Sequence, residues 1–418
     1  MKVVHVSTYD VVGGAARAAY RVHASVRAAG VDSRMLVRES RSGDPHVDVF
    51  RPARDWVSRV GRRVRRLRTT RSLARYDHSR PPGYEPFSTD RGESGAEIAR
   101  QVAGPGTVIN LHWVANFLDY ETFFPAVASR SPIVWTLHDM NAFTGGCHYD
   151  LLCGRYTDRC GACPQLGSRD EADLSRGVWQ RKHELLARQP RLHVVTPSRW
   201  LKGEVARSSV LGHAPVSVIP YGLDVETFAP RDKQAARDVL GIPQDRKVVL
   251  FVADLVDNRR KGFGFLIQAL LGEEDRATNL FLLSLGYNKP ARQMQTPWLH
   301  LERIDNDRIL SLVYSAADVF VIPSVQDNLP NTVLEAMACG TPVVGVAVGG
   351  IPDMVRHERT GLLVAPDDTA GLRKAIRELC HDATRREDMS VNCRRVAVQE
   401  YSLEEQGRRY VDLYTSLL

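Results

Sequence analysis

The chain has 418 residues, with 56 Lys and Arg against 49 Asp and Glu, which gives a net charge of +7. Hydrophobic residues make up 43% and charged residues 25%, an ordinary globular composition that excludes disordered, collagen-like and coiled-coil classes. At roughly 150 residues per domain, the length predicts two or three domains. The basic balance, with a pI near 9.1, favours anionic partners such as phosphates, acidic lipids or nucleic acid, without choosing among them.

The beginning of the chain carries no sign of export. Met1 to Val6 pass directly into a β-rich apolar run, without the basic segment and long apolar stretch of a secretory signal. No apolar stretch approaches the roughly 18 residues that are needed to cross a bilayer. Seven cysteines are too few for a disulfide scaffold in a chain of this length. We therefore expect a protein of the reducing cytoplasm, with any membrane contact peripheral and at the inner face.

Short apolar runs bounded by Gly, Pro or Asp alternate with amphipathic stretches along the whole chain. This pattern predicts an α/β fold in which crossover helices join parallel strands. In the first half, the predicted strands are Val3–Ser7, Ser33–Val37, Thr107–His112, Ile133–His138 and His193–Pro197. In the second half, they are Lys247–Ala253, Leu280–Leu285, Leu299–Glu302, Val319–Pro323, Pro342–Val346 and Gly361–Val364.

The pattern starts afresh after residue 220. The segment from Ile219 to Asp224 contains a proline and a glycine, which prevent either regular structure from continuing. We expect the domain boundary there, with a first domain over residues 1–220 and a second over residues 221–401. A final helix is expected over residues 402–418.

A glycine pair follows the first predicted strand. Gly13 and Gly14 lie between Ser7 and a helix that is expected to start near Ala15. Without Cβ atoms in the loop a phosphate can approach the backbone, and the N–H groups at the helix start favour its charge. A double glycine by itself is equally compatible with an ordinary turn.

Residues 51–80 are unusually rich in arginine. Apolar residues spaced mostly by three and four predict one face of a basic helix, formed by Val57, Val60, Val64, Leu67 and Leu73. One interpretation is a solvated helix packed on the first domain. The other is a surface helix that meets acidic phospholipid headgroups, to which each nearby cation contributes about 1 kcal/mol. No nucleic-acid partner is expected, because no aromatic residues interleave with the arginines as a stacking platform.

The most informative segment runs from Pro323 to Pro342. One carboxylate, Asp327, is on the loop after a buried-looking strand, and a second, Glu335, is one turn into the helix that follows. The helix is expected to end at Gly340, before another strand. Both carboxylates would lie at the carboxyl edge of a parallel sheet, where two acceptors can hold sugar hydroxyls.

This segment resembles the retaining glycosyltransferases of family four, whose signature is two acidic residues separated by seven positions, followed by an Ala-Met-Ala-like and Gly-Thr-Pro run. The resemblance extends over most of the chain. It is supported by four further segments: Ile219–Asp224 with Phe228, Lys261–Gly262, Gly349–Pro352 and Gly361–Val364. The family implies the GT-B fold, in which two Rossmann-like domains face each other across a cleft. It also implies that the final helix packs back on the first domain.

The resemblance implies a role for each matching residue of the second domain. Glu335 would bind the nucleotide ribose, and Asp327 with the amides of Asn328 and Leu329 would hold the donor sugar. Lys261, together with Arg259 or Arg260, would neutralise the diphosphate as the glycosidic bond breaks. One departure is that Asp327 stands where glutamate is usual. Another is that Asp254 and Leu255 occupy the stretch where a first basic residue is expected.

In the first domain, the resemblance implies that Gly13 and Gly14 supply backbone N–H groups to the donor and that His138 lies near its sugar. The implied reaction is retaining transfer from a nucleotide diphosphate sugar, UDP- or GDP-linked, to an acceptor hydroxyl that is plausibly lipid-linked. The implied role is in polysaccharide, glycolipid or other glycoconjugate synthesis. Asp305-Asn306-Asp307 looks like a metal-binding motif, but it directly precedes a helix expected over Arg308–Ala317. We interpret it as a helix cap and expect no catalytic metal or other catalytic cofactor.

Two rival functions remain open at this stage. A nucleotide-sugar epimerase or a sugar phosphorylase can share the two-domain fold. A non-catalytic protein on the same fold would bind the nucleotide without consuming the sugar nucleotide.

Four cysteines gather in one short segment: Cys147, Cys153, Cys160 and Cys163. Four thiolates in an irregular loop can bind zinc tetrahedrally and fix a segment that has little apolar core of its own. Structural zinc is the favoured interpretation, and disulfides, free thiols or another metal are the alternatives.

Overall fold

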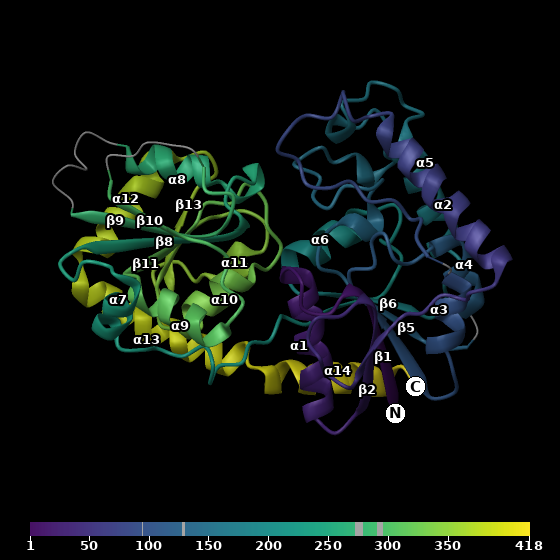
Figure 1. Ribbon diagram of the computed structural model, residues 1–418. Coiled ribbons are helices and arrows are strands. Elements are labelled where there is room, and N and C mark those ends of the chain that lie inside the picture. The colour runs from purple at the N-terminus through teal and green to yellow at the C-terminus, as the bar shows by residue number, and fades with distance from the viewer. Residues whose placement is uncertain (94, 128–129, 272–278, 291–295) are drawn as a thin grey trace. The chain divides into compact units, whose positions relative to one another are not determined.

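The computed structural model describes residues 1–93, 95–127, 130–271, 279–290 and 296–418. The chain divides into two compact units (Figure 1). Unit 1 consists of Met1–Pro220 together with Gln406–Leu418, and unit 2 consists of Tyr221–Glu405. The division between Pro220 and Tyr221 falls in the Pro- and Gly-containing segment that interrupts the strand pattern.

Unit 1 is built on a parallel sheet in the order β3-β2-β1-β4-β5-β6-β7. The order reverses between β1 and β4, which is the topological switch where open α/β sheets bind ligands at the carboxyl ends of the strands. Its strands are β1 (Lys2–Tyr9), β2 (Asp32–Glu39), β3 (Val47–Val49), β4 (Thr107–Leu111), β5 (Ile133–Thr136), β6 (Leu192–Thr196) and β7 (Val216–Val218).

Helices cover both faces of this sheet. One face packs a large apolar cluster that includes Ile109, Phe123 and Trp135, and the other packs Val3 and Val22 with residues near the end of the chain. The helices of unit 1 up to residue 220 are α1 (Gly14–Ala28), α2 (Trp56–Ala74), α3 (Gly95–Val102), α4 (Tyr120–Val127), α5 (Leu174–Leu186) and α6 (Arg199–Arg207). Between β5 and α5 there are only 3-10 turns: η1 (Asn141–Phe143), η2 (Arg155–Thr157) and η3 (Pro164–Leu166).

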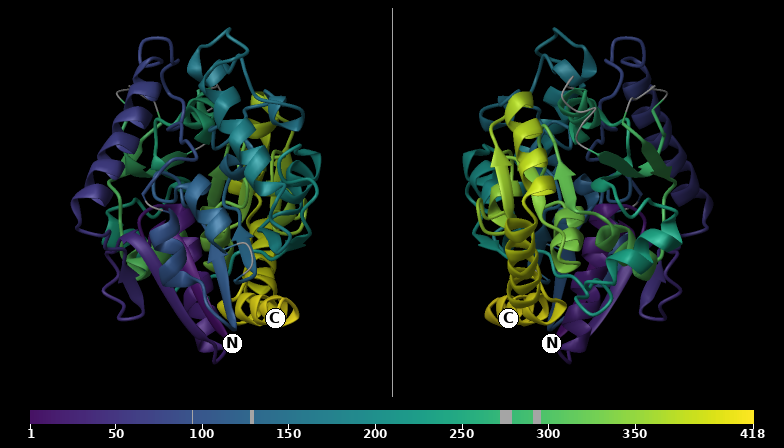
Figure 2. Two further views of the ribbon diagram at one scale, coloured as in Figure 1. Left: turned by 90° about the vertical axis from the view of Figure 1, so that its right-hand side faces the viewer. Right: turned by 90° about the vertical axis from the view of Figure 1, so that its left-hand side faces the viewer.

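The last helix, α14 (Leu403–Ser416), supplies two buried tyrosines to unit 1. The Asn110 amide donates to the Tyr414 hydroxyl over 2.6 Å, and the Thr136 and Tyr410 hydroxyls are 3.1 Å apart. Asn110 lies on β4 and Thr136 on β5, so α14 is tied to the middle of the sheet through polar as well as apolar contacts. In Figure 2, α14 is the yellow helix that lies near both ends of the chain.

Unit 2 repeats the design with a six-stranded parallel sheet in the order β10-β9-β8-β11-β12-β13. The order reverses between β8 and β11, at a second topological switch. Its strands are β8 (Lys247–Leu255), β9 (Leu280–Tyr287), β10 (Trp298–Leu301), β11 (Val319–Ile322), β12 (Val343–Val346) and β13 (Gly361–Val364).

The helices of unit 2 also lie in two layers. One layer, with α8 and α12, packs on Val249, Val321 and Val344 of the sheet, and the other contains α9, α10 and α13. The bounds are α7 (Lys233–Leu240), α8 (Phe263–Leu270), α9 (Asp307–Ala316), α10 (Asn331–Ala338), α11 (Ile351–Met354), α12 (Thr369–His381) and α13 (Ala383–Glu400), with the turn η4 (Arg259–Lys261) before α8.

The predicted α/β class is confirmed, and a strand is found at each of the eleven predicted positions. The sequence pattern missed β3 and β7. Each has three residues, and neither is a buried apolar run, because their side chains are exposed or half-buried. Strands of this kind at the edges of a sheet do not have the periodicity on which a prediction depends.

The arginine-rich segment forms α2, which is only partly packed. Leu73 packs against a small apolar cluster, and Arg62 donates to the Ala53 carbonyl over 2.7 Å. In contrast, Val60, Val64 and Leu67 are exposed, so the predicted apolar face is not buried as a whole. Among the described residues, no helix is long and apolar enough to cross a membrane.

Candidate functional site

Asp327 is the centre of a charged cluster at the carboxyl edge of the unit 2 sheet. It lies on the loop after β11, and the residue is buried, with 4% of its surface exposed. The Lys261 ammonium, from the turn that follows β8, donates to Asp327 Oδ2 over 2.6 Å. Arg260 lies 3.3 Å from Oδ1 and also donates to the Gln326 carbonyl over 2.8 Å. Two cations and one carboxylate therefore meet at the β8–β11 switch.

The charges of this cluster stabilise one another. Burial by itself would raise the pKa of Asp327, but the facing Lys261 and Arg260 cations favour the carboxylate and lower the pKa to about 2. Asp327 is therefore ionised throughout the physiological range. A second anion placed beside Lys261 and Arg260 would compete with this carboxylate for the same two cations.

Two glycines hold the Asp327 loop at close range. A Cβ atom at Gly262 would lie 1.8 Å from the Pro323 carbonyl oxygen, and one at Gly349 would lie 1.8 Å from the Asp327 carbonyl oxygen. Both residues also have positive φ angles, of 74° and 56°. The backbone N–H of Gly350 donates to the Asp327 carbonyl over 3.0 Å. The glycines that the sequence singles out thus allow the backbone contacts that set the position of the acid.

Glu335 lies on α10, about one turn after the start of the helix at Asn331, and is 5% exposed. Its Oε2 accepts a hydrogen bond from the Tyr314 hydroxyl of α9 over 2.9 Å. A buried carboxylate that keeps a polar partner is oriented rather than free to rotate. Tyr314 was not recognised from the sequence, because the sequence of a helix does not indicate which group a tyrosine hydroxyl will bond.

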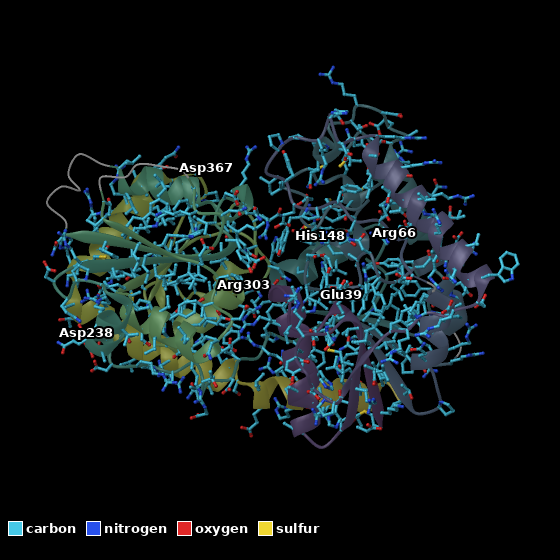
Figure 3. All side chains as sticks on the ribbon, in the orientation of Figure 1. Glu39, Arg66, His148, Asp238, Arg303 and Asp367 are labelled. Carbon is cyan, nitrogen blue, oxygen red and sulfur yellow. The ribbon has the colours of Figure 1, made fainter. Side chains whose placement is uncertain are left out.

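The other candidates of unit 2 fall into two groups. Asn328 and Leu329 are buried beside Asp327, and the Asn328 N–H donates to Asp327 Oδ1 over 3.1 Å. Arg259 is exposed, whereas Arg260 is buried and reaches the carboxylate. The structure thus brings Arg260 and Lys261 to Asp327. Asp254, on the stretch where a basic residue was expected, lies 3.4 Å from Arg303 (labelled in Figure 3).

The Asp305-Asn306-Asp307 motif is a helix cap, as predicted. The Asn306 side chain accepts from the N–H groups of Arg308 and Ile309 at the start of α9, over 3.0 and 3.2 Å. Asp305 pairs with Arg303 over 2.7 Å. α9 begins at Asp307, one residue earlier than the predicted start.

In unit 1, the glycine pair stands at the start of α1, after the switch strand β1. Gly13 has a φ of 85° and precedes the helix, and Gly14 is its first residue. The preceding loop is fixed by Asp10, which is fully buried and accepts from Ser40, Arg41 and Ser42 over 2.7 to 3.0 Å. A loop held in this way keeps the helix start in one position.

His138 ends a chain of three buried imidazoles at the carboxyl edge of the unit 1 sheet. The His138 Nε2 is 3.1 Å from His112 Nδ1, and His112 Nε2 is 2.9 Å from His5 Nδ1. Burial lowers the pKa of His138 to about 4 and those of His112 and His5 well below 6.5. All three imidazoles are therefore neutral at pH 7, and each hydrogen bond along the chain fixes the tautomer of the next ring.

A second polar group lies next to His138. Asp139 accepts from the Trp113 indole over 3.0 Å and lies 2.6 Å from the ring of His148 (labelled in Figure 3). His148 is held from its other side by Ser88, over 2.9 Å. A cavity of about 20 Å³ lies against His138 and Asp139. The edge of unit 1 thus presents hydrogen-bonding groups that burial and pairing hold in fixed positions.

Sequence reasoning missed the inner members of this group: His5, His112 and Asp139. Both histidines occur within predicted strands, where alternation alone suggests structural residues. Their spacing along the chain, of 107 residues between the bonded pair, carries no local motif. These residues could be found only from the strand order, because β1, β4 and β5 are neighbours in the sheet and bring the imidazole rings together.

The four clustered cysteines line one cavity in the irregular segment between β5 and α5. Cys147, Cys160 and Cys163 are buried and Cys153 is half-buried, and all four thiols are free. Among the described residues, no three His, Cys, Asp or Glu side chains already stand around a common point at metal-binding spacing.

Comparisons with known proteins agree with the fold. Residues 246–382, within unit 2, match the family model described as glycosyl transferases group 1. The chain is similar to the D-inositol 3-phosphate glycosyltransferase of Mycobacteroides abscessus, with 34% identity over 40% of this chain and 39% of that protein. It is also similar to an uncharacterized glycosyltransferase of Methanocaldococcus jannaschii, with 28% identity over 66% of this chain and 73% of that protein.

Among solved structures, the Anabaena protein HepE, in a complex with UDP and glucose, matches all of both chains with a TM-score of 0.68 and 16% identity. A structural similarity at 16% sequence identity is evidence about the fold alone. It shows that the two parallel-sheet halves are the Rossmann-like halves of the GT-B fold. The match to the Mycobacteroides abscessus protein spans only about two fifths of its length.

Proposed function

We propose that this protein is a glycosyltransferase that moves a sugar from a nucleotide diphosphate sugar to an acceptor hydroxyl, with retention of anomeric configuration. The observation that carries the proposal is the cluster of Lys261, Arg260 and Asp327 at the β8–β11 switch of unit 2. The family match over residues 246–382, which contains this cluster and Glu335, supports it.

The cluster fits the demanding step of glycosyl transfer, the departure of a diphosphate. Negative charge develops on the phosphate oxygen as the bond from the anomeric carbon breaks, and a positioned cation stabilises it. Lys261 is half-buried and fixed by its 2.6 Å bond to Asp327, so little reorganisation is needed at the moment of reaction. Arg260 adds a second, always charged group. In this proposal Glu335, oriented by Tyr314, accepts from the ribose hydroxyls.

The proposed reaction needs no protein nucleophile. The acceptor oxygen bonds to the anomeric carbon on the face that the diphosphate leaves, and the acceptor proton passes to the leaving phosphate oxygen. Retention follows, because the bond forms and breaks on the same face. No metal is required in this proposal, since Lys261 and Arg260 supply positive charge at the leaving group.

We assign the recognition of the sugar to His138 in unit 1. A neutral imidazole can donate to or accept from a hydroxyl without charging, and burial keeps His138 neutral at pH 7. The amides at the start of α1, after Gly13 and Gly14, offer N–H donors suited to an anionic group. The chemistry proposed for unit 1 is thus hydrogen bonding, and that for unit 2 is charge stabilisation.

The test is a panel of UDP, GDP, ADP and dTDP sugars, with binding measured by calorimetry and slow hydrolysis by release of the nucleoside diphosphate. We expect one nucleotide class to bind and to be hydrolysed slowly, as when water replaces the acceptor. Binding without consumption of any sugar nucleotide would favour a non-catalytic binding protein. Release of free sugar phosphate with orthophosphate would favour a phosphorylase, and interconversion of sugars an epimerase.

We also propose that α2 makes peripheral contact with an acidic membrane at the cytoplasmic face, where a lipid-linked acceptor would be presented. Its exposed apolar residues, Val60, Val64 and Leu67, lie in the same helix as many arginines, among them Arg66 (labelled in Figure 3). Apolar insertion and headgroup attraction together are the two signals that stable surface binding needs.

Sedimentation with vesicles tests this contact. Leu67→Glu should reduce binding to vesicles that contain phosphatidylglycerol, while Val239→Glu, at an exposed valine of α7, should not. Equal binding to neutral vesicles, or an equal loss in both variants, would count against the role of α2.

A further inference from the structure

The segment from residue 139 to 173 contains no strand and no α-helix, although residues 140–150 are buried. Its backbone follows three short turns and takes positive φ angles at Leu151, Leu152 and Ala162, which are unfavourable for side chains with a Cβ. Such a conformation persists only where the surroundings over-determine it.

One part of the segment packs in the large apolar cluster of unit 1 through Met140, Phe143 and Tyr156. Around Cys147 and Cys163 the apolar cluster is small, with Phe87 and Leu166 as its other buried members. Few apolar contacts therefore fix this part of the segment.

Four cysteines of the segment line one pocket. Cys147, Cys153, Cys160 and Cys163 lie around a cavity of about 20 Å³, which is room for one water-sized sphere. None of the four forms a disulfide. They are separated by six, seven and three positions along the chain, so the turns of the segment, rather than one short motif, bring the four cysteines to the same pocket.

We propose that these four cysteines bind one structural zinc ion in the cavity. Zinc in structural sites is four-coordinate and tetrahedral, and four thiolates form a closed set without an open position. Each thiol gives up its proton on binding, so four protons leave as the ion enters, and the site carries a net charge of −2. The site would fix the part of the segment around Cys147 and Cys163, where the apolar cluster is small.

Burial raises the pKa of the Cys147, Cys160 and Cys163 thiols, and polar groups around the pocket offset part of this cost of forming thiolates. The Gly145 N–H donates to the Cys160 sulfur over 3.2 Å, and the backbone N–H groups of Gln165 and Leu166 face the Cys163 sulfur. Lys182 of α5 is fully buried, and its ammonium donates to the Asn141 and Thr144 carbonyls, over 2.5 and 3.1 Å, within electrostatic range of Cys147 and Cys160. Hydrogen bonds and a nearby cation favour the charged form of sulfur.

Ligation requires an adjustment of the side chains. Among the described residues no formed ligand set is present, so the sulfurs must turn about the single rotatable bond between Cα and Cβ.

The zinc site would hold the end of α2. Leu73 and Tyr76 pack against the cluster of Cys147 and Cys163, and the Tyr76 hydroxyl accepts from the Leu174 N–H over 3.1 Å. Ser79, which follows, donates to the Leu166 carbonyl over 2.7 Å. Loss of the metal should therefore loosen residues 75–80, which contain the trypsin site Arg75.

Metal analysis of the full-length protein, purified without chelator, tests the proposal directly. We expect about one zinc ion per chain by elemental mass spectrometry. Mass spectrometry of the intact chain should show seven free thiols after the metal is removed. Cobalt(II) added to the chelated protein should give the intense visible bands of a tetrahedral thiolate site. Stoichiometric iron in place of zinc, two disulfides in the segment, or no metal after incubation with zinc would each overturn it.

Variants separate a specific site from adventitious metal. Cys160→Ser and Cys163→Ser should each lower the zinc content to below about a tenth of the wild-type value, because a closed site needs all its ligands. Cys380→Ala, at a buried cysteine of α12 in unit 2, should keep it. Zinc retained in both ligand variants would refute the assignment. If the variants fail to fold, chelation of wild-type protein still decides the matter, through faster tryptic cleavage after Arg75 that zinc reverses.

The zinc site and glycosyl transfer stand or fall separately. Metal content, thiol count and proteolysis are measured without any sugar nucleotide. A protein that holds zinc and consumes no donor would retain the inference and remove the proposed function.

Discussion

The two sheets carry different kinds of polar group at the same place in their topology. In unit 2 the switch holds full charges, Lys261, Arg260 and Asp327, which remain ionised in a buried setting because each faces an opposite charge. In unit 1 the switch holds His138 and His112, which burial keeps neutral. One fold, used twice, thus provides an edge suited to a phosphate and an edge suited to hydroxyls.

The largest expected effect comes from removing the cation of the charged edge. Lys261→Ala should lower turnover about 10²- to 10³-fold, the loss typical of one positioned group that stabilises developing charge. The affinity for the donor should change much less. Steady-state kinetics that separate kcat from KM measure both. Lys374→Ala, at an exposed lysine of α12, is the matched control. An unchanged kcat in Lys261→Ala would remove the distinction between the two edges.

The next effect concerns binding rather than turnover. Glu335→Gln keeps the size of the side chain but removes the charge, and a hydrogen bond to a charged group contributes about 1.5–3 kcal/mol. We therefore expect the donor to bind roughly ten- to hundredfold more weakly. Tyr314→Phe, which removes the 2.9 Å bond to Glu335 and leaves the carboxylate, should have a smaller effect in the same direction. Calorimetry with the free nucleoside diphosphate gives both values, and a larger loss in Tyr314→Phe would contradict the assignment of Glu335.

The neutral edge should appear in the dependence of stability on pH. Burial lowers the pKa of His138 and of His23 to about 4, and those of His5 and His112 further below 6.5. Below about pH 6.5 the unfolded chain therefore binds protons that the folded chain does not. Stability of unit 1 is full above pH 6.5 and is lost as the pH falls toward 4, by up to about 1.4 kcal/mol per pH unit for each histidine.

Thermal unfolding between pH 7.5 and 5 measures this slope. His23→Gln should reduce it by about one proton, because His23 is fully buried. His213→Gln, at an exposed histidine, should leave it unchanged. A stability that does not fall below pH 6.5 would mean that the imidazoles take up protons in the folded state.

The smallest expected effect concerns the last helix, α14, whose tyrosines form hydrogen bonds with β4 and β5 of unit 1. Tyr414→Phe removes the hydroxyl that accepts from Asn110 over 2.6 Å but keeps the buried ring. Loss of one buried hydrogen bond should cost about 1 kcal/mol. In a unit of this size the melting temperature should fall by roughly 2–4 °C. Thr415→Val, at an exposed position of the same helix, should change it by less, and equal shifts would show that the tyrosine hydroxyl contributes nothing specific.

The sequence predicted the charged edge better than the neutral one, for a physical reason. Asp327 and Glu335 belong to one loop and helix, so their relation is local and leaves a readable spacing. His5, His112 and His138 meet only because three strands are neighbours in the sheet, and strand order is not written in any single segment. The choice between Arg259 and Arg260, which the sequence left open, depends on three-dimensional structure in the same way. Both precede Lys261, and only the turn decides which one faces the acid.

Prediction of the fold followed the same rule. Buried parallel strands are recognisable as apolar runs, whereas β3 and β7 are short edge strands without such a run. The apolar residues of α2 were expected to share one face, and their periodicity was correct. Which face packs depends on tertiary contacts, and there Leu73 is packed while Val60 and Leu67 remain exposed.

Unit 1 is assembled from two stretches of chain, and this has a consequence for its synthesis. Its first stretch ends at Pro220 and its second begins at Gln406, so 405 − 220 = 185 residues are translated between them. At about 5–20 residues per second, the ribosome needs roughly 10–40 s for this interval. During that time Val3 and Val22 have no tyrosines of α14 to cover them. Unit 1 is thus synthesised first but completes its fold only when the end of the chain emerges. Chaperones that recognise exposed apolar surface should bind it during this interval.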